Sequence, residues 1–319
     1  MKKSRGRVHT ALRRIKQRLK PRRLRERGAT AVRLDVARLP YMGFGATVSW
    51  LQMAHVAADA LGARLHVANC DQWPFGGRRA ECALDRFLEV PADTPGPAIE
   101  FDPGNRQNLA QWGYYDELHW SGCAFGYRPA AFASLEAYRR NVLARVYRPT
   151  GHAREAVAAQ LAFLPERFIA WHVRRGDKTA GPAKEDEAVP LERYAHATAL
   201  LLRDATDPPA ALVVCTDSPD VIAQARDVAA GLGLRLVVDE REKRWDGYCA
   251  LHRSGEITDV NEMVAEVLTA QKVIEILRRA HGLVGCNSSY LYRVGAMLQG
   301  SGRAASLSEN KTFRPYFPL

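Results

Sequence analysis

Hydrophobic and polar positions along the first third of the chain repeat with two different periods. Short apolar runs at 31–36 and 64–68 predict strands, and a stretch with a period near 3.6 at 47–61 predicts a helix between them. Gly62 suits the C-terminal cap of that helix. A strand, a helix and a further strand in this order predict a βαβ unit.

The second half of the chain repeats this alternation several times. Apolar runs predict strands at 168–173, 211–217, 234–238 and 282–286, and periodic stretches predict helices at 191–203, 218–230, 261–280 and 287–298. Strands that alternate with helices in this way indicate a doubly wound α/β fold with a parallel sheet.

A Pro-Thr-Gly segment at 149–151 separates two predicted helices, at about 134–146 and 152–164, and marks the junction between two halves. The length of 319 residues also suits two domains. We therefore expect a leader at 1–28, an N-terminal Rossmann-like domain at 29–150 that binds the acceptor, and a C-terminal Rossmann-like domain at 151–319 that binds the donor.

Residues 71–127 contain few periodic segments and three tryptophans, Trp73, Trp112 and Trp120. An irregular, aromatic-rich region of this kind suits an acceptor cleft. Packing in the core is the commoner role of any single tryptophan. The sequence leaves both interpretations open.

Positive charge is concentrated in the leader. Residues 1–28 hold thirteen of the 46 Lys and Arg residues and one of the 35 acidic residues, which leaves 33 basic and 34 acidic residues for the body. The body is therefore close to neutral, although the whole chain has a net charge of +11. Because a nucleic-acid-binding fold carries its basic patch on the folded body, the charge disfavours that class of protein.

The leader lacks the apolar core of a signal peptide, and no apolar run elsewhere is long enough to predict a membrane span. We expect a disordered, solvated leader on a cytoplasmic protein, and weak attraction of the leader to the anionic inner face of a membrane is a further hypothesis. The six cysteines have no CxxC spacing, so we expect reduced thiols and no metal site.

The apolar run at 168–173 leads into the most informative stretch of the chain. It ends in a set of polar and charged residues, His172, Arg174, Arg175, Asp177 and Lys178. Guanidinium groups match phosphate geometry, and open α/β sheets bind ligands beyond the carboxyl ends of their strands. The alternative is a surface ion-pair cluster in which Asp177 neutralises one arginine.

Three further strand-to-helix turns carry groups that suit a nucleotide. The turn Gly43-Phe44-Gly45 lets backbone approach a ligand beside a helix N-terminus, although it lacks the third glycine of the dinucleotide fingerprint. The amide of Asn287 and the hydroxyls of Ser288 and Ser289 can cap the next helix or hold a phosphate. Asp217 can cap its helix or accept a hydrogen bond from a ribose hydroxyl or a base amine.

On one parallel sheet, the turns at Arg174, Asp217 and Ser288 open on the same edge. Cations, hydroxyls and helix N-termini at that edge form a diphosphate pocket that stabilises a departing nucleoside diphosphate. Since no Walker lysine loop or set of Mg²⁺ carboxylates accompanies them, glycosyl transfer fits better than phosphoryl transfer.

Four stretches of the sequence resemble signatures of the α1,6-fucosyltransferase superfamily, which includes core and nodulation fucosyltransferases and, more distantly, protein O-fucosyltransferases. The first motif is HVRRGDK followed by PLERY, and the second and third are VVCTDSPDVI and LVGCNSSYLYRVGAML. The stretch GFGATVSWLQMAHVAADALGARLHV is similar to the N-terminal glycine loop and helix. Together these stretches span most of the body.

The resemblance implies two facing Rossmann-like domains of the GT-B type, GDP-fucose as donor, and inversion at the sugar carbon without a metal or other cofactor. Arg174 and Arg175 would bind the donor phosphates, with Arg174 at the β-phosphate, and His172 would contact the donor. Ser288 and Ser289 would bind phosphate oxygens.

The resemblance also assigns roles to residues outside these turns. Gly43 and Gly45 would let the N-terminal domain close over the pyrophosphate. The general base of the family is a glutamate shortly after the first motif, here Glu185 or Glu187, and Lys178 occupies the family's lysine position. The alternative is that these glutamates belong to a solvated acidic loop.

In the family, an aspartate in the helix before the third motif recognises the guanine base, and the sequence departs from the family at this position. The corresponding residue is Val273, and Glu275 lies two positions further on. Either Glu275 takes over this role or the base is recognised differently. Tyr290 also replaces the polar residue that usually follows the paired serines.

The sequence therefore predicts an inverting, metal-independent glycosyltransferase that transfers fucose from GDP-fucose to a saccharide or glycolipid. A glycosyltransferase with another GDP- or UDP-sugar donor is the first alternative. The second is a non-enzymatic protein that binds polyanions through the leader at 1–28, whose binding would be sensitive to salt.

Overall fold

A computed structural model describes most of the body of the chain. The described residues are 30–39, 43–74, 82–91, 96–105, 107–108, 129–175, 179, 186–242, 259–300 and 303–308. Contacts divide the chain into unit 1, Met1–Met42 with Thr47–Arg148, and unit 2, Gly43–Ala46 with Pro149–Leu319. The predicted leader lies outside the described residues.

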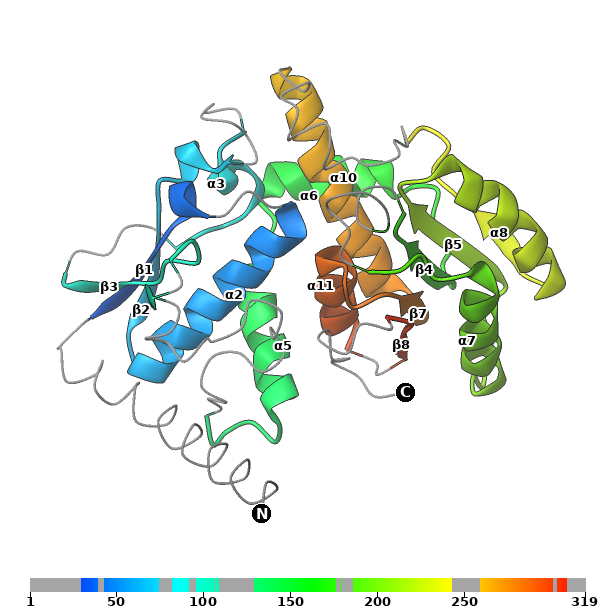
Figure 1. The fold of residues 1–319 in the computed structure, drawn as a ribbon, viewed down its shortest axis with the longest axis horizontal. Helices are drawn as coiled ribbons and strands as arrows, with labels where there is room; N and C mark the ends of the chain where they lie inside the picture. Colours follow the sequence, from blue (N-terminus) through cyan, green and yellow to red (C-terminus); the bar gives the residue numbers. More distant parts are fainter. Residues whose placement is uncertain are drawn as a thin grey trace, which may run out of the picture. The chain divides into compact units, whose positions relative to one another are not determined.

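Unit 1 contains a three-stranded parallel sheet with the strand order β2-β1-β3. Its strands are β1 (Ala31–Asp35), β2 (Arg64–Ala68) and β3 (Ala98–Glu100). Helix α2 (Phe44–Leu61) connects β1 to β2, as Figure 1 shows, and the predicted βαβ unit is confirmed. The helix begins at Phe44 rather than at Thr47, and β3 was not predicted.

Hydrogen bonds join helix α5 (Leu135–Val146) to α2. The Gln52 side-chain amide donates to the carbonyl of Arg139 at 2.8 Å, and the Tyr138 hydroxyl donates to Asp59 at 2.7 Å. Ser134 caps α5, because its hydroxyl accepts from the backbone N–H of Ala137. The predicted helix near 134–146 is therefore present.

Unit 2 contains a five-stranded parallel sheet with the strand order β6-β5-β4-β7-β8. Its strands are β4 (Ile169–Val173), β5 (Ala211–Thr216), β6 (Arg235–Val237), β7 (Gly282–Gly285) and β8 (Ala304–Ser306). The first four match predicted strands, and the three-residue β8 was not predicted. The order reverses between β4 and β7, as in the doubly wound order 3-2-1-4-5.

The helices of unit 2 cover both faces of this sheet (Figure 1). They are α6 (Gly151–Gln160), α7 (Leu191–Arg203), α8 (Pro219–Gly231), α10 (Val260–Arg279) and α11 (Tyr290–Gln299). Ala170 packs in a core with residues of α6, α10 and α11, whereas its neighbours Ile169 and Trp171 pack with residues of α7 and α8. This period of two puts apolar side chains on both faces.

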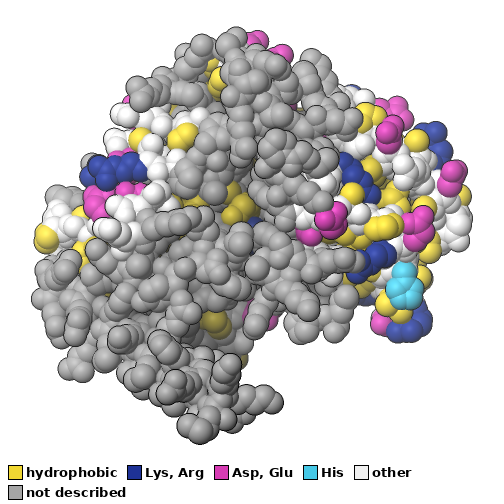
Figure 2. Space-filling model, viewed as in Figure 1, with side chains coloured by type: hydrophobic (Ala, Val, Ile, Leu, Met, Phe, Trp, Pro, Cys, Tyr) yellow, Lys and Arg dark blue, Asp and Glu magenta, His cyan; other side chains and the backbone are white. Residues whose placement is uncertain are grey.

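Both units thus have all-parallel sheets, which confirms the predicted α/β class with two Rossmann-like sheets. On the face in Figure 2, both basic and acidic side chains are visible among the described residues. Among the described helices, none combines the length and the apolar character that a membrane crossing needs. That the two units face each other stays a prediction.

Candidate functional site

The carboxyl edge of the unit 2 sheet brings three of the predicted turns together. Val173 at the end of β4 pairs with Thr216 at the end of β5, and Trp171 in β4 pairs with Val284 in β7. Arg174, Asp217 and the serine turn therefore follow neighbouring strands at one edge. The strand order reverses between β4 and β7, and open α/β sheets generally bind ligands beyond the carboxyl ends of the strands at such a point.

Arg174 is the first residue after β4 and lies near Asp217. Its Nε is 3.8 Å from Oδ2 of Asp217, and 22% of the Arg174 side chain is exposed. Oδ1 of Asp217 accepts a hydrogen bond from the backbone N–H of Arg175 at 2.8 Å. Asp217 therefore braces the turn after β4, while Ser218 is the N-cap residue of α8. Its predicted contact with a ribose or a base stays a prediction.

Arg175 has different partners from Arg174. Its guanidinium donates to the carbonyl of Arg174 at 3.2 Å and to the carbonyl of Val189 at 2.8 Å. These bonds tie the turn after β4 to the segment that precedes α7. Since a guanidinium has five N–H donors, donors remain for the phosphate contact that the sequence predicts.

His172 is the last but one residue of β4, and its side chain is buried. Burial, together with the positive charge of Arg174, lowers the pKa of His172 to about 3, so its imidazole is neutral near pH 7. The backbone carbonyl of His172 accepts from the Tyr194 hydroxyl at 3.2 Å. Nδ1 of His172 has no hydrogen-bond partner among the described residues. Because a buried polar atom without a hydrogen bond costs free energy, a ligand that forms a hydrogen bond with this atom would stabilise it.

The turn after β7 is formed by Asn287, Ser288 and Ser289, all of them buried. Ser289 is the N-cap residue of α11, yet within the described residues its side chain makes no capping hydrogen bond. The backbone N–H of Asn287 donates to the Ser306 hydroxyl at 3.2 Å, and its side-chain Nδ2 has no partner in the described part of the chain. Helix α11 thus begins at Tyr290, not at Asn287 as predicted, and presents its positive N-terminus at this edge.

Glu275 is not brought to this edge. It lies in the last turns of α10, which lead to the amino end of β7, and its carboxylate is 2.6 Å from the guanidinium of Arg278 and 3.9 Å from that of Arg279. The neighbouring Val273 is buried in the core. The predicted contact of Glu275 with the donor base stays a prediction, and its observed partners are arginines of its own helix.

The acidic loop is described only from Asp186 onward. Glu185 and Lys178, like Asp177, lie outside the described residues, so their predicted catalytic roles stay predictions. Glu187 is exposed, and its backbone N–H donates to Asp186 at 2.9 Å. Asp186 in turn accepts from the Ser308 hydroxyl, which follows β8.

The two glycines of the N-terminal loop differ in what surrounds them. A Cβ atom on Gly45 would lie 2.9 Å from the backbone N of Leu291 in α11, whereas nothing lies within 4 Å of such an atom on Gly43. Both glycines belong to unit 2. Gly45 is therefore required for a close backbone approach, and the donor contact predicted for both stays a prediction.

Tyr194 lies near this edge and was missed from the sequence. The Tyr194 hydroxyl lies 3.5 Å from Sγ of Cys286, and burial raises the pKa of both groups. No motif marks Tyr194. Asn287 was predicted together with the paired serines as part of the turn that precedes the next helix.

Trp73, from the aromatic region predicted as an acceptor cleft, is a core residue. Its side chain is buried, its Nε1 donates to the Thr47 hydroxyl at 3.2 Å, and its ring packs against Phe87. Trp112 and Trp120 lie outside the described residues. Among the described residues, no three His, Cys, Asp or Glu side chains are grouped so as to hold a metal ion.

No protein-family model and no curated protein sequence matches this chain. Its structure is similar to crystal structures of NodZ α-1,6-fucosyltransferase. One soaked with GDP-fucose is 17% identical with a TM-score of 0.48, over 85% of this chain and 92% of the other. One co-crystallised with GDP, and a selenomethionine form from Bradyrhizobium, have the same TM-score and coverage at 16% identity. At this level of similarity, the function has to be inferred from the residues of this chain.

Proposed function

We propose that this chain is a glycosyltransferase that takes its sugar from a nucleotide-diphosphate donor, with GDP-fucose as the expected donor. The observation that carries the proposal is the group of residues at the switch point between β4 and β7. Arg174 supplies a cation, α11 supplies a helix N-terminus, and Ser288 and Ser289 supply hydroxyls. These three kinds of group together favour a phosphate-bearing ligand.

In the proposed reaction, a hydroxyl of the acceptor attacks the anomeric carbon of the donor sugar. The new C–O bond forms as the bond to the diphosphate oxygen breaks, and the electron pair leaves with the diphosphate. Arg174 and the N-terminus of α11 stabilise the negative charge that develops on the leaving group. The hydroxyl proton passes to Glu185 or Glu187, and attack opposite the leaving group inverts the configuration at the sugar carbon.

Replacement of Arg174 tests this proposal. We expect Arg174→Ala to lower kcat for release of GDP from GDP-fucose by about 100- to 1,000-fold, the usual effect of removing one charged contact to a transition state. The melting temperature of the variant should stay close to that of the wild type, because the Arg174 side chain is partly exposed.

A matched control is Arg203→Ala, because Arg203 is an exposed arginine at the end of α7 that pairs with Asp204 at 2.8 Å. This control should keep the wild-type rate. Equal rates for wild type and Arg174→Ala would refute the assignment.

A donor with a base other than guanine is a second candidate, and two observations favour it. Val273, at the position of the family's base-reading aspartate, is buried in the core, and Glu275 is paired with Arg278 and Arg279. Calorimetric titration of GDP and UDP in parallel separates the two candidates. Tighter binding of GDP supports a GDP-sugar such as GDP-fucose, and tighter binding of UDP supports a UDP-sugar.

A further inference from the structure

Unit 1 has a switch point of its own. In the order β2-β1-β3, the strand order reverses between β1 and β3. In flavodoxin-like sheets, the ligand binds at the same kind of switch point. The residues at the carboxyl ends of these strands are Asp35 and Arg38 after β1, Asn69 after β2 and Asp102 after β3. None of them belongs to the motifs discussed above.

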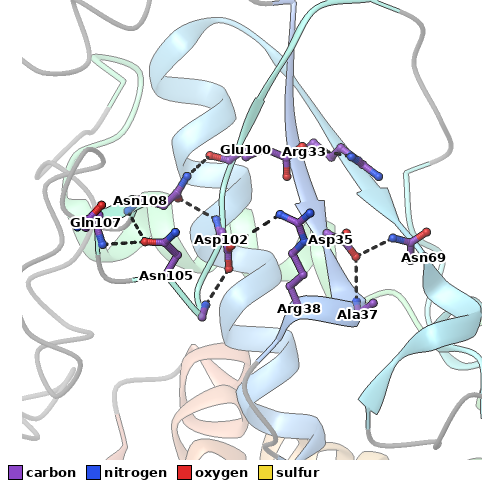
Figure 3. Close-up of polar contacts among 11 residues, drawn as sticks. Arg33, Asp35, Ala37, Arg38, Asn69, Glu100, Asp102, Asn105, Gln107 and Asn108 are labelled. Carbon is purple, nitrogen blue, oxygen red and sulfur yellow. Dashed lines mark hydrogen bonds and ion pairs between the residues drawn. The ribbon is translucent and has the colours of Figure 1, made fainter.

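These four residues form a continuous polar row across the sheet edge, which Figure 3 shows. Nε of Arg38 lies 3.4 Å from Asp35, and Nη1 of Arg38 lies 3.9 Å from Asp102. Nδ2 of Asn69 donates to Asp35 at 2.8 Å. The row therefore runs Asp102, Arg38, Asp35, Asn69, in the spatial order of the strands β3, β1 and β2.

Backbone contacts hold the two carboxylates of this row in place. Asp35 is 7% exposed and accepts from the backbone N–H of Ala37 at 3.1 Å. Asp102 accepts from the backbone N–H of Gly104 at 3.0 Å. Asn69 has a φ of 57°, a left-handed conformation that asparagine tolerates. The side chains of the row are thus held in place by contacts within the chain.

Two hollows border the row, one at each end. The first, about 640 Å³, is lined by Arg38, Asp102, Gly104, Asn105 and Gln107. The second, about 520 Å³, is lined by Asn69 and by residues that include His66, Asp71 and Asp85. Both hollows are open to solvent, the first more widely than the second.

The chemistry of the row favours a neutral ligand with many hydroxyl groups. Arg38 is shared between Asp35 and Asp102, so the row carries one more negative than positive charge, which repels phosphates and other anions. Carboxylates accept hydrogen bonds, the guanidinium donates them, and amides do both. A sugar hydroxyl can donate to one member of the row and accept from its neighbour.

We propose that this row binds the saccharide acceptor along the carboxyl edge of β1, β2 and β3. The inference rests on the proposed glycosyl transfer, which requires an acceptor hydroxyl, and it adds the residues that bind the acceptor. Because neighbouring strands lie about 4.8 Å apart, the row spans roughly 10 Å, which suits an oligosaccharide better than a single sugar.

The test compares binding of the full chain and its variants to an array of immobilised neutral oligosaccharides. Asp102→Asn keeps the acceptor for Gly104 and removes the charge, and Arg38→Gln removes the guanidinium. Each should weaken binding about tenfold or more, as expected for the loss of a hydrogen bond to a charged group. Arg64→Gln, which changes an exposed arginine at the amino end of β2, should bind as the wild type does.

Absence of binding to any neutral oligosaccharide would overturn the inference, as would equal binding by wild type, Asp102→Asn and Arg38→Gln. Melting temperatures identify a variant that has lost its fold, in which case the other variant decides. Titration of GDP and UDP into the same samples tests the proposed function separately. Both row variants should bind nucleotide as the wild type does, and failure of the wild type to bind either nucleotide would overturn the proposed function instead.

Discussion

Arg174 and Arg175 are adjacent in the sequence, yet they differ in what they contact. The guanidinium of Arg175 binds two backbone carbonyls, one of which belongs to Val189, whereas Arg174 is partly exposed beside Asp217. The sequence identifies both as cations at a strand end. It cannot show which of the two the fold uses to hold the turn, because the carbonyl of Val189 is brought close only by the packing of the segment before α7.

At the same scale, Glu266 in α10 has an unusual ionisation. Burial first, and then the negative charges of Glu242 and Glu262, raise its pKa from 4.5 to about 7, and Lys272 opposes this shift. Between pH 4.5 and 7 the folded protein therefore holds a proton that the unfolded chain has lost. The contribution of Glu266 to stability is full below pH 4.5 and is lost as the pH rises through 7.

We therefore expect Glu266→Gln to be more stable than the wild type at pH 8, by on the order of 2 kcal/mol, with a difference that shrinks as the pH falls to 4. Denaturant unfolding at several pH values measures it. Glu155→Gln, an exposed change on α6, serves as the control and should show no such trend. A Glu266→Gln effect that is the same at every pH would contradict this account of the carboxyl group.

At the scale of elements, segments with a clear apolar pattern were predicted well, and two short strands without one were missed. The four predicted strands of unit 2 and helices α7, α8 and α10 are present near their expected positions, because each has several apolar residues with a clear period. The strands β3, β6 and β8 have three residues each, but of these only β6 lies within a longer apolar run that the sequence shows, at 234–238. Helix α11 begins three residues later than predicted, because Asn287, Ser288 and Ser289 form the turn that faces the carboxyl edge.

Close packing of α10 and α11 depends on Gly295. A Cβ atom at this position would lie 2.4 Å from Cβ of Leu277 in α10, so Gly295→Ala forces the two helices apart. We expect this variant to lose about 1–3 kcal/mol of unfolding free energy, the usual cost of overpacking a core. Thermal and denaturant unfolding give the value.

Gly231→Ala is the matched control for this variant, because nothing lies within 4 Å of a Cβ atom on Gly231, the last residue of α8. This change should leave stability unaltered or raise it slightly, since alanine favours a helix more than glycine does. Equal losses in the two variants would show that the effect comes from the helix backbone and not from the contact with Leu277.

At the scale of the whole chain, each unit has a parallel sheet with a switch point, and the two switch points carry different chemistry. Unit 2 presents Arg174, two serines and the N-terminus of α11, whereas unit 1 presents the row of Asp102, Arg38, Asp35 and Asn69. The sequence predicted the first set because motifs mark it. It could not predict the second, because the order of strands in a sheet decides which loops become neighbours, and β3 was not visible in the pattern.

The central claim is that Arg174 binds the phosphates of a nucleotide at the switch point of unit 2. Calorimetric titration of GDP and UDP into wild type, Arg174→Ala and Arg203→Ala tests it most directly. The account predicts that the wild type and Arg203→Ala bind one of these nucleotides equally well, and that Arg174→Ala binds it at least about tenfold more weakly, as for a lost charged hydrogen bond. Equal affinity of the wild type and Arg174→Ala, with both folded, would contradict the claim.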